Sequence, residues 1–300
     1  LADAYRERGP ACLERLHGHF ALAIADHARN TLLLTTDRLG VHPLAYQITA
    51  DGVVFGSSLN SLRKHPDFIA DINPQALFDY LYFHMVPSPG AIYRHTSKLL
   101  PAQYVLIEPD RFNAGFYWQP EYHDRHDDEA VLATELKTHL HNAVERSLQP
   151  DPGTTGAFLS GGLDSSTVTG VYASQRQAPV QAYSIGFHAE GYDETPFAQI
   201  SAGHFGAQLN TYYVTPDDVA TALPLLARAY DEPFGNASAV GAYYCARFAR
   251  QQGIDCLLAG DGGDELFAGN SRYARQKMFS VYDALPRSLR RVLIEPFGLR

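Results

Sequence analysis

The sequence predicts an α/β protein built from two regions with different residue patterns. Residues 1–118 carry short apolar runs separated by turn residues, which is typical of antiparallel strands. From residue 130 onward, strand-length apolar runs alternate with helix-length amphipathic segments, which predicts a parallel sheet with helical crossovers. The polar stretch QPEYHDRHDDE, residues 119–129, lies between the two regions and is interpreted as a linker.

The first region favours one short helix followed mainly by strands. The opening segment LADAYRERGPACLERL is amphipathic. Strands are expected at residues 20–26 and 31–37, and HPLAYQITADGVVFGSS adds two more that meet at an Asp51-Gly52 hairpin turn. QALFDYLYFH favours a helix, and QYVLIEPDRFNAGFYW predicts strands on both sides of a Pro-Asp turn. Together these elements predict an antiparallel, meander-like sheet.

The second region predicts four strands separated by helices. Helices are expected at residues 130–148, 164–177, 195–207, 216–230 and 239–253. Strands are expected at residues 155–159, 180–187, 209–214 and 255–259. Ligands bind at the carboxyl ends of the strands in such sheets, so the loops that follow the first and last strands are candidate sites.

Composition narrows the function classes. The chain has 300 residues, 45% of them hydrophobic, and a formal net charge of −9. This acidic balance argues against a nucleic-acid partner, which would need a basic face. No apolar run is long enough for a membrane span, so no membrane partner is expected. The three cysteines include no CxxC pair, which predicts neither disulfides nor a zinc site and fits a cytoplasmic protein.

The first candidate loop is FLSGGLDSS, residues 158–166, at a predicted strand–helix joint. Gly161 and Gly162 allow a sharp turn and a close approach to a ligand. Free amides at the start of the helix suit a phosphate group. The hydroxyls that can add donors are those of Ser160, Ser165 and Ser166. No GxxxxGK[ST] pattern occurs, so ordinary γ-phosphoryl transfer is not predicted.

Acidic residues in and near both loops suggest a cation. The carboxylate of Asp164 would repel phosphate unless it holds Mg²⁺. The second loop, LLAGDGGDELFAGNSRY, places Asp261, Asp264 and Glu265 around a tight glycine turn, which is costly without a cation or partner. If the two strand ends are neighbours, Asp164 and Asp264 can share Mg²⁺. Each loop also has a purely structural interpretation without a ligand. The first loop would then be a glycine-rich turn capped by Asp and Ser, and the second an exposed acidic turn.

The pair SGGLDSS and GDGGDELFAG resembles the glutamine-dependent asparagine synthetase family. YDEPFGNASAVGAYYCARFARQQGID is similar to its substrate-side segment, and ERLHGHFALAIADHARNTLLLTTDRLGVHPLAYQ resembles part of its N-terminal glutaminase domain. FGSSLNSLRKHP fits a Ser-Glu-x-Lys-like run of that domain. The resemblance implies a parallel-sheet PP-loop ATP-pyrophosphatase domain at residues 130–300, preceded by a partial antiparallel α+β N-terminal-nucleophile-type glutaminase domain at residues 1–118.

The chain also departs from that family. Members active on glutamine begin with a processed Cys nucleophile, and no residue here matches it; Cys12 is interpreted as a small packed residue. A downstream catalytic Lys of the family has no counterpart before Arg300. We therefore expect a chain that is truncated at both ends and inactive by itself as a glutaminase.

The resemblance implies an amide-forming ligase that uses ATP, Mg²⁺, aspartate and glutamine-derived ammonia, and it is compatible with a homodimer. The aspartate carboxylate attacks the α-phosphate, giving β-aspartyl-AMP and pyrophosphate, and ammonia then displaces AMP. Asp261 stands where some members have a Glu proposed to position or deprotonate the incoming group. Mg²⁺ is assigned to Asp164 and Asp264. The residues implied in ATP and pyrophosphate binding are Leu159, Ser160, Gly161, Gly162, Leu163, Asp164, Ser165, Ser166, Ile185 and Gly260.

Two other functions stay open. One is an amide ligase or amidotransferase acting on another carboxylate in a biosynthetic cluster. A β-lactam synthetase-like enzyme is disfavoured, since that branch tends to carry Tyr at the position of Asp261. The other is a non-catalytic nucleotide-binding module.

Overall fold

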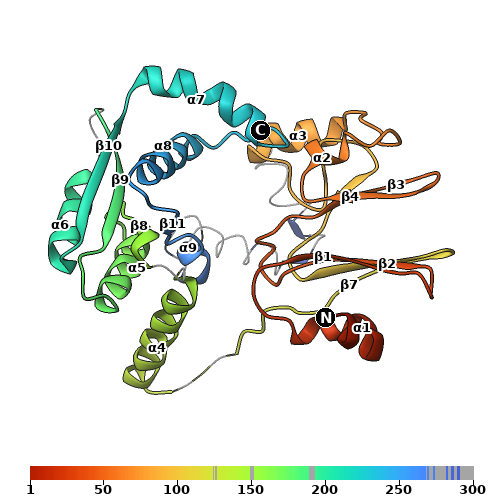
Figure 1. Cartoon of the computed structure of the whole chain (residues 1–300), viewed down its shortest axis with the longest axis horizontal. Helices are drawn as coiled ribbons and strands as arrows, with labels where there is room; N and C mark the ends of the chain where they lie inside the picture. Colours follow the sequence, from red (N-terminus) through yellow and green to blue (C-terminus); the bar gives the residue numbers. More distant parts are fainter. Residues whose placement is uncertain are drawn as a thin grey trace. The chain divides into compact units, whose positions relative to one another are not determined.

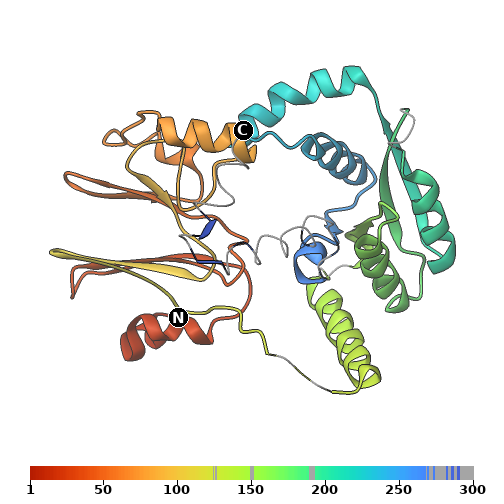
Figure 2. The ribbon, with the colours of Figure 1, turned by 180° about the vertical axis from the view of Figure 1, so that it is seen from behind.

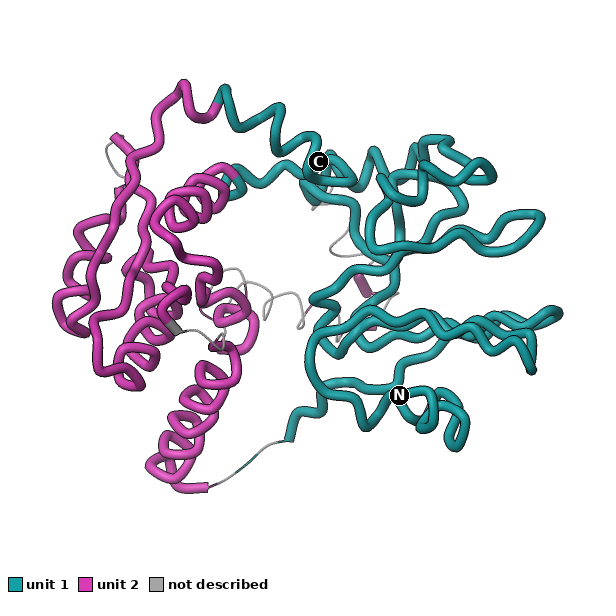
Figure 3. Tube along the Cα trace, viewed as in Figure 1, with its two compact units in different colours: residues 1–126, 220–239 teal, residues 127–219, 240–300 magenta. Residues whose placement is uncertain are grey.

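The computed structural model describes residues 1–123, 125, 127–148, 152–188 and 193–267. It also describes residues 269, 273, 282, 285–286 and 289–290. The chain forms two compact units (Figures 1 and 3). Unit 1 comprises Leu1–His126 and Ala220–Ala239, and unit 2 comprises Asp127–Val219 and Val240–Arg300. Each unit is described by itself below.

Unit 1 contains two antiparallel sheets (Figure 2). The first has the order β1-β2-β6-β7, and its strands are Ala21–Asp26, Thr31–Thr36, Gln103–Glu108 and Arg111–Phe116. The second has the order β4-β3-β5, and its strands are Gly52–Gly56, Ala45–Thr49 and Thr96–Lys98. The antiparallel strands were expected, but they do not form one meander, because β2 pairs with β6 rather than with β3.

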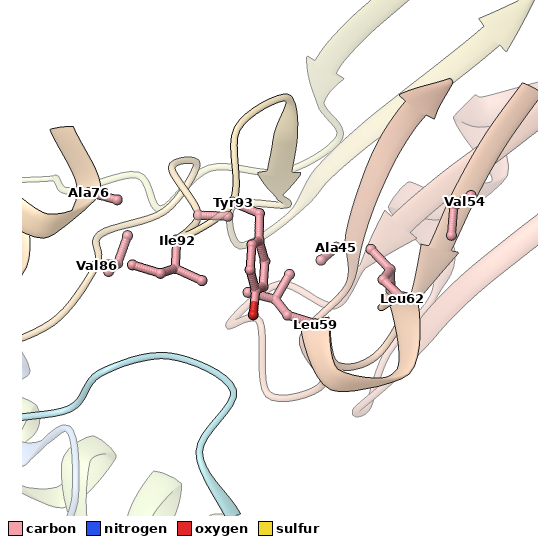
Figure 4. Close-up of a cluster of buried hydrophobic side chains, with 9 residues drawn as sticks. Ala45, Val54, Leu59, Leu62, Ala76, Val86, Ile92 and Tyr93 are labelled. Atoms are coloured by element: carbon pink, nitrogen blue, oxygen red, sulfur yellow. The ribbon is translucent and has the colours of Figure 1, made fainter. Parts of the chain in front are cut away.

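Helices cover the outer faces of these two sheets. α1 (Ala2–Arg8) and the 3₁₀ helix η1 (Gly9–Arg15) pack on the first sheet through a core that includes Tyr5, Leu13 and Leu33. α2 (Leu59–Leu62) and α3 (Pro74–Phe83) pack on the second through Leu59, Ala76 and their neighbours (Figure 4). Residues of both sheets share a further core: Leu34, Val105, Tyr46 and Val53. Unit 1 is therefore a four-layer helix–sheet–sheet–helix α+β structure.

Unit 2 is built on a four-stranded parallel sheet of order β10-β9-β8-β11. The strands are β8 (Thr155–Phe158), β9 (Gln181–Phe187), β10 (Gln208–Val214) and β11 (Cys256–Leu258). Along the chain the helices between these strands are α5 (Leu163–Ser174), α6 (Thr195–Phe205), α7 (Pro216–Ala229) and α8 (Ser238–Gln251). Residues Ala220–Ala239, which include most of α7 and the start of α8, belong to unit 1. α4 (Glu129–Ser147) precedes β8 and α9 (Gly263–Phe267) follows β11. The short 3₁₀ helix η2 (Pro152–Thr154) leads into β8. The predicted alternation of strands and helices is confirmed.

The two faces of this sheet bury different side chains, because successive strand residues point to opposite sides. Ala157 packs with Tyr172 of α5 and Val144 of α4. The neighbouring Phe158 packs instead in the cluster that contains Cys245 and Ala249 of α8. Helices thus cover both faces, which is the usual environment of a parallel sheet. Among the described residues, no helix combines the length and the apolar character that a bilayer crossing requires.

Candidate functional site

The first candidate loop joins β8 to α5, as the sequence predicted. Leu159 is 1% exposed, and its amide donates to the carbonyl of Tyr183 on β9 at 2.8 Å, which fixes the strand end. Gly161 has φ +88°, and a Cβ there would lie 2.5 Å from the amide nitrogen of Ala198 on α6. Only glycine fits both the left-handed backbone and this close approach.

The start of α5 presents the amides expected at a phosphate site. The first helical bond runs from the amide of Ser166 to the carbonyl of Gly162 at 3.0 Å. The amides of Leu163, Asp164 and Ser165 precede this bond, so no carbonyl of the helix itself can satisfy them. Leu163 is 81% exposed, and this end of α5 is therefore open to solvent. An anion placed there is favoured by these amides and by the positive end of the helix.

The serine hydroxyls are more organised than the sequence alone indicated. The Oγ atoms of Ser160 and Ser165 lie 3.0 Å apart, and the amide of Gly162 donates to Ser160 Oγ at 3.2 Å. These bonds hold the loop in a closed turn. The hydroxyl of Ser166 instead pairs with Ser201 of α6 at 2.9 Å. Ser165 Oγ also accepts the amide of Ser160 at 3.2 Å, so all three hydroxyls have partners within the protein, and Ser160 is the exposed one.

The second candidate loop follows β11, which pairs in parallel with β8 over Cys256–Leu258. Along the chain, β9 and then β10 are added on one side of β8. The last strand, β11, is added on the opposite side of β8, so the strand order reverses between β8 and β11. Such a reversal is where open α/β sheets bind ligands, at the carboxyl ends of the strands. The structure confirms that the two loops predicted from the sequence leave neighbouring strands.

The two loops touch at Gly260. A Cβ at Gly260 would lie 2.7 Å from both the carbonyl carbon of Asp164 and the amide nitrogen of Ser165. The carboxyl group of Asp164 lies against Gly263, the residue directly before Asp264. Glycine at these positions therefore lets the second loop pack on the backbone of the first.

The donor chemistry of this junction suits Mg²⁺, a cation that prefers carboxylate oxygens and retains several waters. Asp164 and Asp264 are half-buried, and Asp261 is exposed. Among the described residues, no group of three or more His, Cys, Asp or Glu side chains is arranged to hold a metal ion.

Ile185 belongs to a neighbouring part of the sheet. It is the fifth residue of β9 and packs partly buried in the cluster of Tyr183, Cys245 and Ile254. The position of Gly241 on α8 lies in ordinary contact range of Ile185, with a Cβ there 3.9 Å from its Cγ2. Ile185 thus connects the sheet to the first turns of α8.

Two contacts at the loops were not found by sequence reasoning. Ser201 lies on α6, which carries no motif of its own, so its bond to Ser166 could not be predicted from local pattern. Tyr273 lies near the acids of the second loop: desolvation raises the pKa of its hydroxyl, and Glu265 and Asp264 raise it further. The only sequence feature that could have indicated this contact is that Tyr273 ends the GDELFAGNSRY segment, which begins with the same acids.

Unit 1 contains a buried carboxylate that organises the residues after β2. Asp37 is 1% exposed and accepts backbone amides of Phe20, Leu39, Val41 and His42 at 3.1–3.2 Å. Burial by itself would raise the pKa of Asp37, but these amides stabilise the ionised form and hold the pKa below its usual value. Asp37 therefore fixes the DRLGVH turn.

Cys12 is a core residue of unit 1. It is 1% exposed, and burial raises the pKa of its thiol. A raised pKa disfavours the thiolate that a nucleophile needs. The structure thus agrees with the interpretation of Cys12 as a packed side chain.

Comparison with known proteins bears on both units. Residues 135–297 match the family described as Asparagine synthase, and residues 1–118 match Glutamine amidotransferase domain. The chain belongs to the asparagine synthase family. The two loops at β8 and β11 both lie inside the asparagine synthase match.

Individual proteins similar to this asparagine synthase family member cover most of its length. The chain is 33% identical to putative asparagine synthetase [glutamine-hydrolyzing] 2 of Methanocaldococcus jannaschii, over 97% of this chain and 57% of the relative. It is 28% identical to asparagine synthetase [glutamine-hydrolyzing] 1 of Bacillus subtilis, over 100% of this chain and 48% of the relative. It is also 25% identical to amidase chyE of Penicillium rubens, over 88% of this chain and 42% of the relative. The chain spans about half the length of these curated relatives.

Proposed function

We propose that the complete protein is an ATP-dependent amide-forming ligase of the glutamine-hydrolysing asparagine synthetase type. One observation carries the proposal: the loops after β8 and β11 touch at the reversal of strand order, with Gly260 against Asp164 and Ser165. This junction combines free helix-start amides with carboxylates, which suits a nucleotide with its metal ion. Residues 1–118 are the glutaminase-like domain and the synthetase domain begins at residue 130 in this proposal.

The roles of the residues follow from their positions. The amides of Leu163–Ser165, with the hydroxyls of Ser160 and Ser165, bind the pyrophosphate part of ATP at the turn made by Gly161 and Gly162. Asp164 and Asp264 hold Mg²⁺, which offsets phosphate charge when bound. Ile185 is assigned to the apolar side toward the adenine. The side chain of Leu159 is buried against Ala182 and Ala198, so Leu159 is assigned a role through its backbone at the strand end.

The reaction is the transfer of AMP to a carboxylate. The β-carboxylate of aspartate attacks the α-phosphate and pyrophosphate leaves, after which ammonia displaces AMP to give the amide. No lysine lies in the first loop to stabilise transfer of the terminal phosphate, which is consistent with pyrophosphate as the leaving group. Asp261 is exposed beside this junction and is assigned to positioning or deprotonating the attacking nitrogen.

The products test the proposal directly. The complete gene product, given Mg-ATP, ammonia and aspartate, is expected to form AMP, pyrophosphate and asparagine, measured by chromatography. Ammonia is used because it removes the need for glutamine hydrolysis. ADP and phosphate as products would reject the mechanism.

A second candidate is an amide ligase acting on a different carboxylate. The similarity to a protein named as an amidase favours keeping it. If AMP forms with another carboxylate as substrate and does not form with aspartate, the mechanism is preserved and this candidate is selected.

A further inference from the structure

The segment Tyr230–Gly235 joins α7 to α8 and has an unusual position in the chain. It lies inside the asparagine synthase match at residues 135–297. Its contacts nevertheless place it in unit 1, together with the residues that match the glutamine amidotransferase domain (Figure 3). The chain thus passes from unit 2 into unit 1 within α7 and returns to unit 2 at Val240.

Glu232 is the first anchor of this segment. One of its carboxylate oxygens accepts the amide of Ile92 at 2.6 Å, and the other forms an ion pair with the Nζ of Lys98. The side chains of Glu232 and Lys98 are only 14% and 19% exposed. Lys98 also donates to the carbonyl of Val86 at 2.8 Å. Because both charges are mostly shielded from water, this pair is stronger than an ordinary surface ion pair.

Asp231 is the second anchor. Its carboxylate accepts the amides of Leu59 at 2.8 Å and Asn60 at 3.2 Å. Three residues beyond Glu232, the amide of Gly235 donates to the carbonyl of His84 at 2.8 Å. We call Asp231, Glu232 and Lys98, the partner of Glu232, the acid clamp.

The acid clamp is attached to the core of unit 1. Leu59 and Ile92, whose amides it engages, are 3% and 5% exposed and belong to the cluster of buried side chains in Figure 4. Both carboxylates are already engaged by backbone amides, and Glu232 also by a lysine, so neither is free to bind a substrate or metal. A positional role is what these contacts support.

The chain connects this anchor to the nucleotide side of unit 2 by a short path. Ser238, the first residue of α8, follows Glu232 by only six positions. The first turns of α8 reach Ile185 through Gly241, and Cys245 and Ala249 fix the helix in the core against Tyr183. Only five residues separate Glu232 from the start of α8, so the anchor limits where the chain can enter this helix.

We propose that the acid clamp is a positioning device that couples the two reactions of the complete protein. It holds the segment before α8 on the glutaminase-like unit, so that ammonia released from glutamine is used for amide formation. The inference rests on the proposed function. Each glutamine hydrolysed releases one glutamate and one ammonia, and each amide formed consumes one ammonia. Tight coupling therefore gives glutamate and amide in equal amounts.

The test uses the complete gene product and two variants that remove the charge pair, Glu232→Gln and Lys98→Met. Asp217→Asn, an exposed acid on α7, is the matched control. With glutamine as nitrogen source, the ratio of glutamate to amide is expected to rise at least about fivefold in both variants, the lower end of ordinary coupling between sites. With ammonia as nitrogen source, the rate of amide formation is expected to stay within about twofold of wild type, as is every value for the control.

Each outcome decides the question. A ratio that stays at the wild-type value in folded variants would overturn the acid clamp and leave the proposed function intact. Equal loss of the glutamine- and ammonia-dependent rates, with an unchanged ratio, would show a purely structural role and also overturn it. If Glu232→Gln does not fold, Asp231→Asn supplies the same comparison. No amide from ammonia with the wild-type protein would reject the proposed function and this inference together.

Discussion

Replacing Gly260 by alanine tests whether the contact between the two loops holds the candidate site together. The new Cβ would lie 2.7 Å from two backbone atoms, the carbonyl carbon of Asp164 and the amide nitrogen of Ser165. Ordinary contact begins at 3.4 Å, so the loops must separate by about 0.7 Å. Backbone atoms at the start of a helix cannot rotate away as a flexible side chain can.

Crowding of this kind in a packed region costs about 1–3 kcal/mol. If Gly260→Ala destabilises the β8–β11 pair by about 2 kcal/mol, the free energy of opening this pair falls by the same amount. Amide exchange in the two strands then becomes about 30-fold faster. Hydrogen exchange with mass spectrometry, applied to peptides that cover β8 and β11, measures this locally. A local measurement is needed because a chain with two units does not have one unfolding transition. The affinity for Mg-ATP, measured by calorimetry, is expected to fall as the loops separate.

The control is the same substitution at Gly203, an exposed position of α6 where a Cβ would meet nothing within 4 Å. Alanine there is expected to stabilise the helix by up to about 1 kcal/mol. Exchange in β8 and β11 should therefore be unchanged or slower. If Gly260→Ala left exchange in both strands at the wild-type rate while the control behaved as described, the contact between the loops would not be stabilising the site.

Two further predictions concern carboxylates. Asp164→Asn and Asp264→Asn keep the size of each side chain but remove its charge, so calorimetry of the complete protein should show weaker Mg-ATP binding; unchanged affinity in both would reject the metal assignment. Asp37→Asn leaves amides facing a poorer acceptor and is expected to lower the stability of unit 1 by about 1–3 kcal/mol at neutral pH. Because the folded-state pKa of Asp37 lies below the unfolded value, its contribution is present above about pH 4 and is lost as the pH falls through the folded-state pKa. The difference in stability between wild type and variant, followed by hydrogen exchange, should shrink over that acidic range, and a difference independent of pH would contradict this role.

Much of the fold was readable from local pattern. After residue 130, each helix and strand has its own hydrophobic pattern, which depends only on residues close together in the chain. The strands β8, β9, β10 and β11 were therefore all predicted, with small differences at their ends. In unit 1 the hairpin at Asp51-Gly52 follows from turn chemistry, and β3 and β4 pair across it. The short strand β5 was missed, because Thr96–Lys98 has too few residues to show a period and is defined by its pairing with β3.

Residue types along the chain were enough to predict the chemistry at the two strand ends: glycines for a tight approach, serines and helix-start amides for an anion, and acids for a cation. They could not place the two loops side by side. That depends on β11 pairing with β8 on the side opposite β9, a choice between strand partners distant in sequence. The same limit applies to Glu232 and Lys98, which are 134 residues apart and meet only after folding. Local pattern depends on neighbours along the chain, whereas these contacts depend on which buried surfaces pack together once the chain is folded.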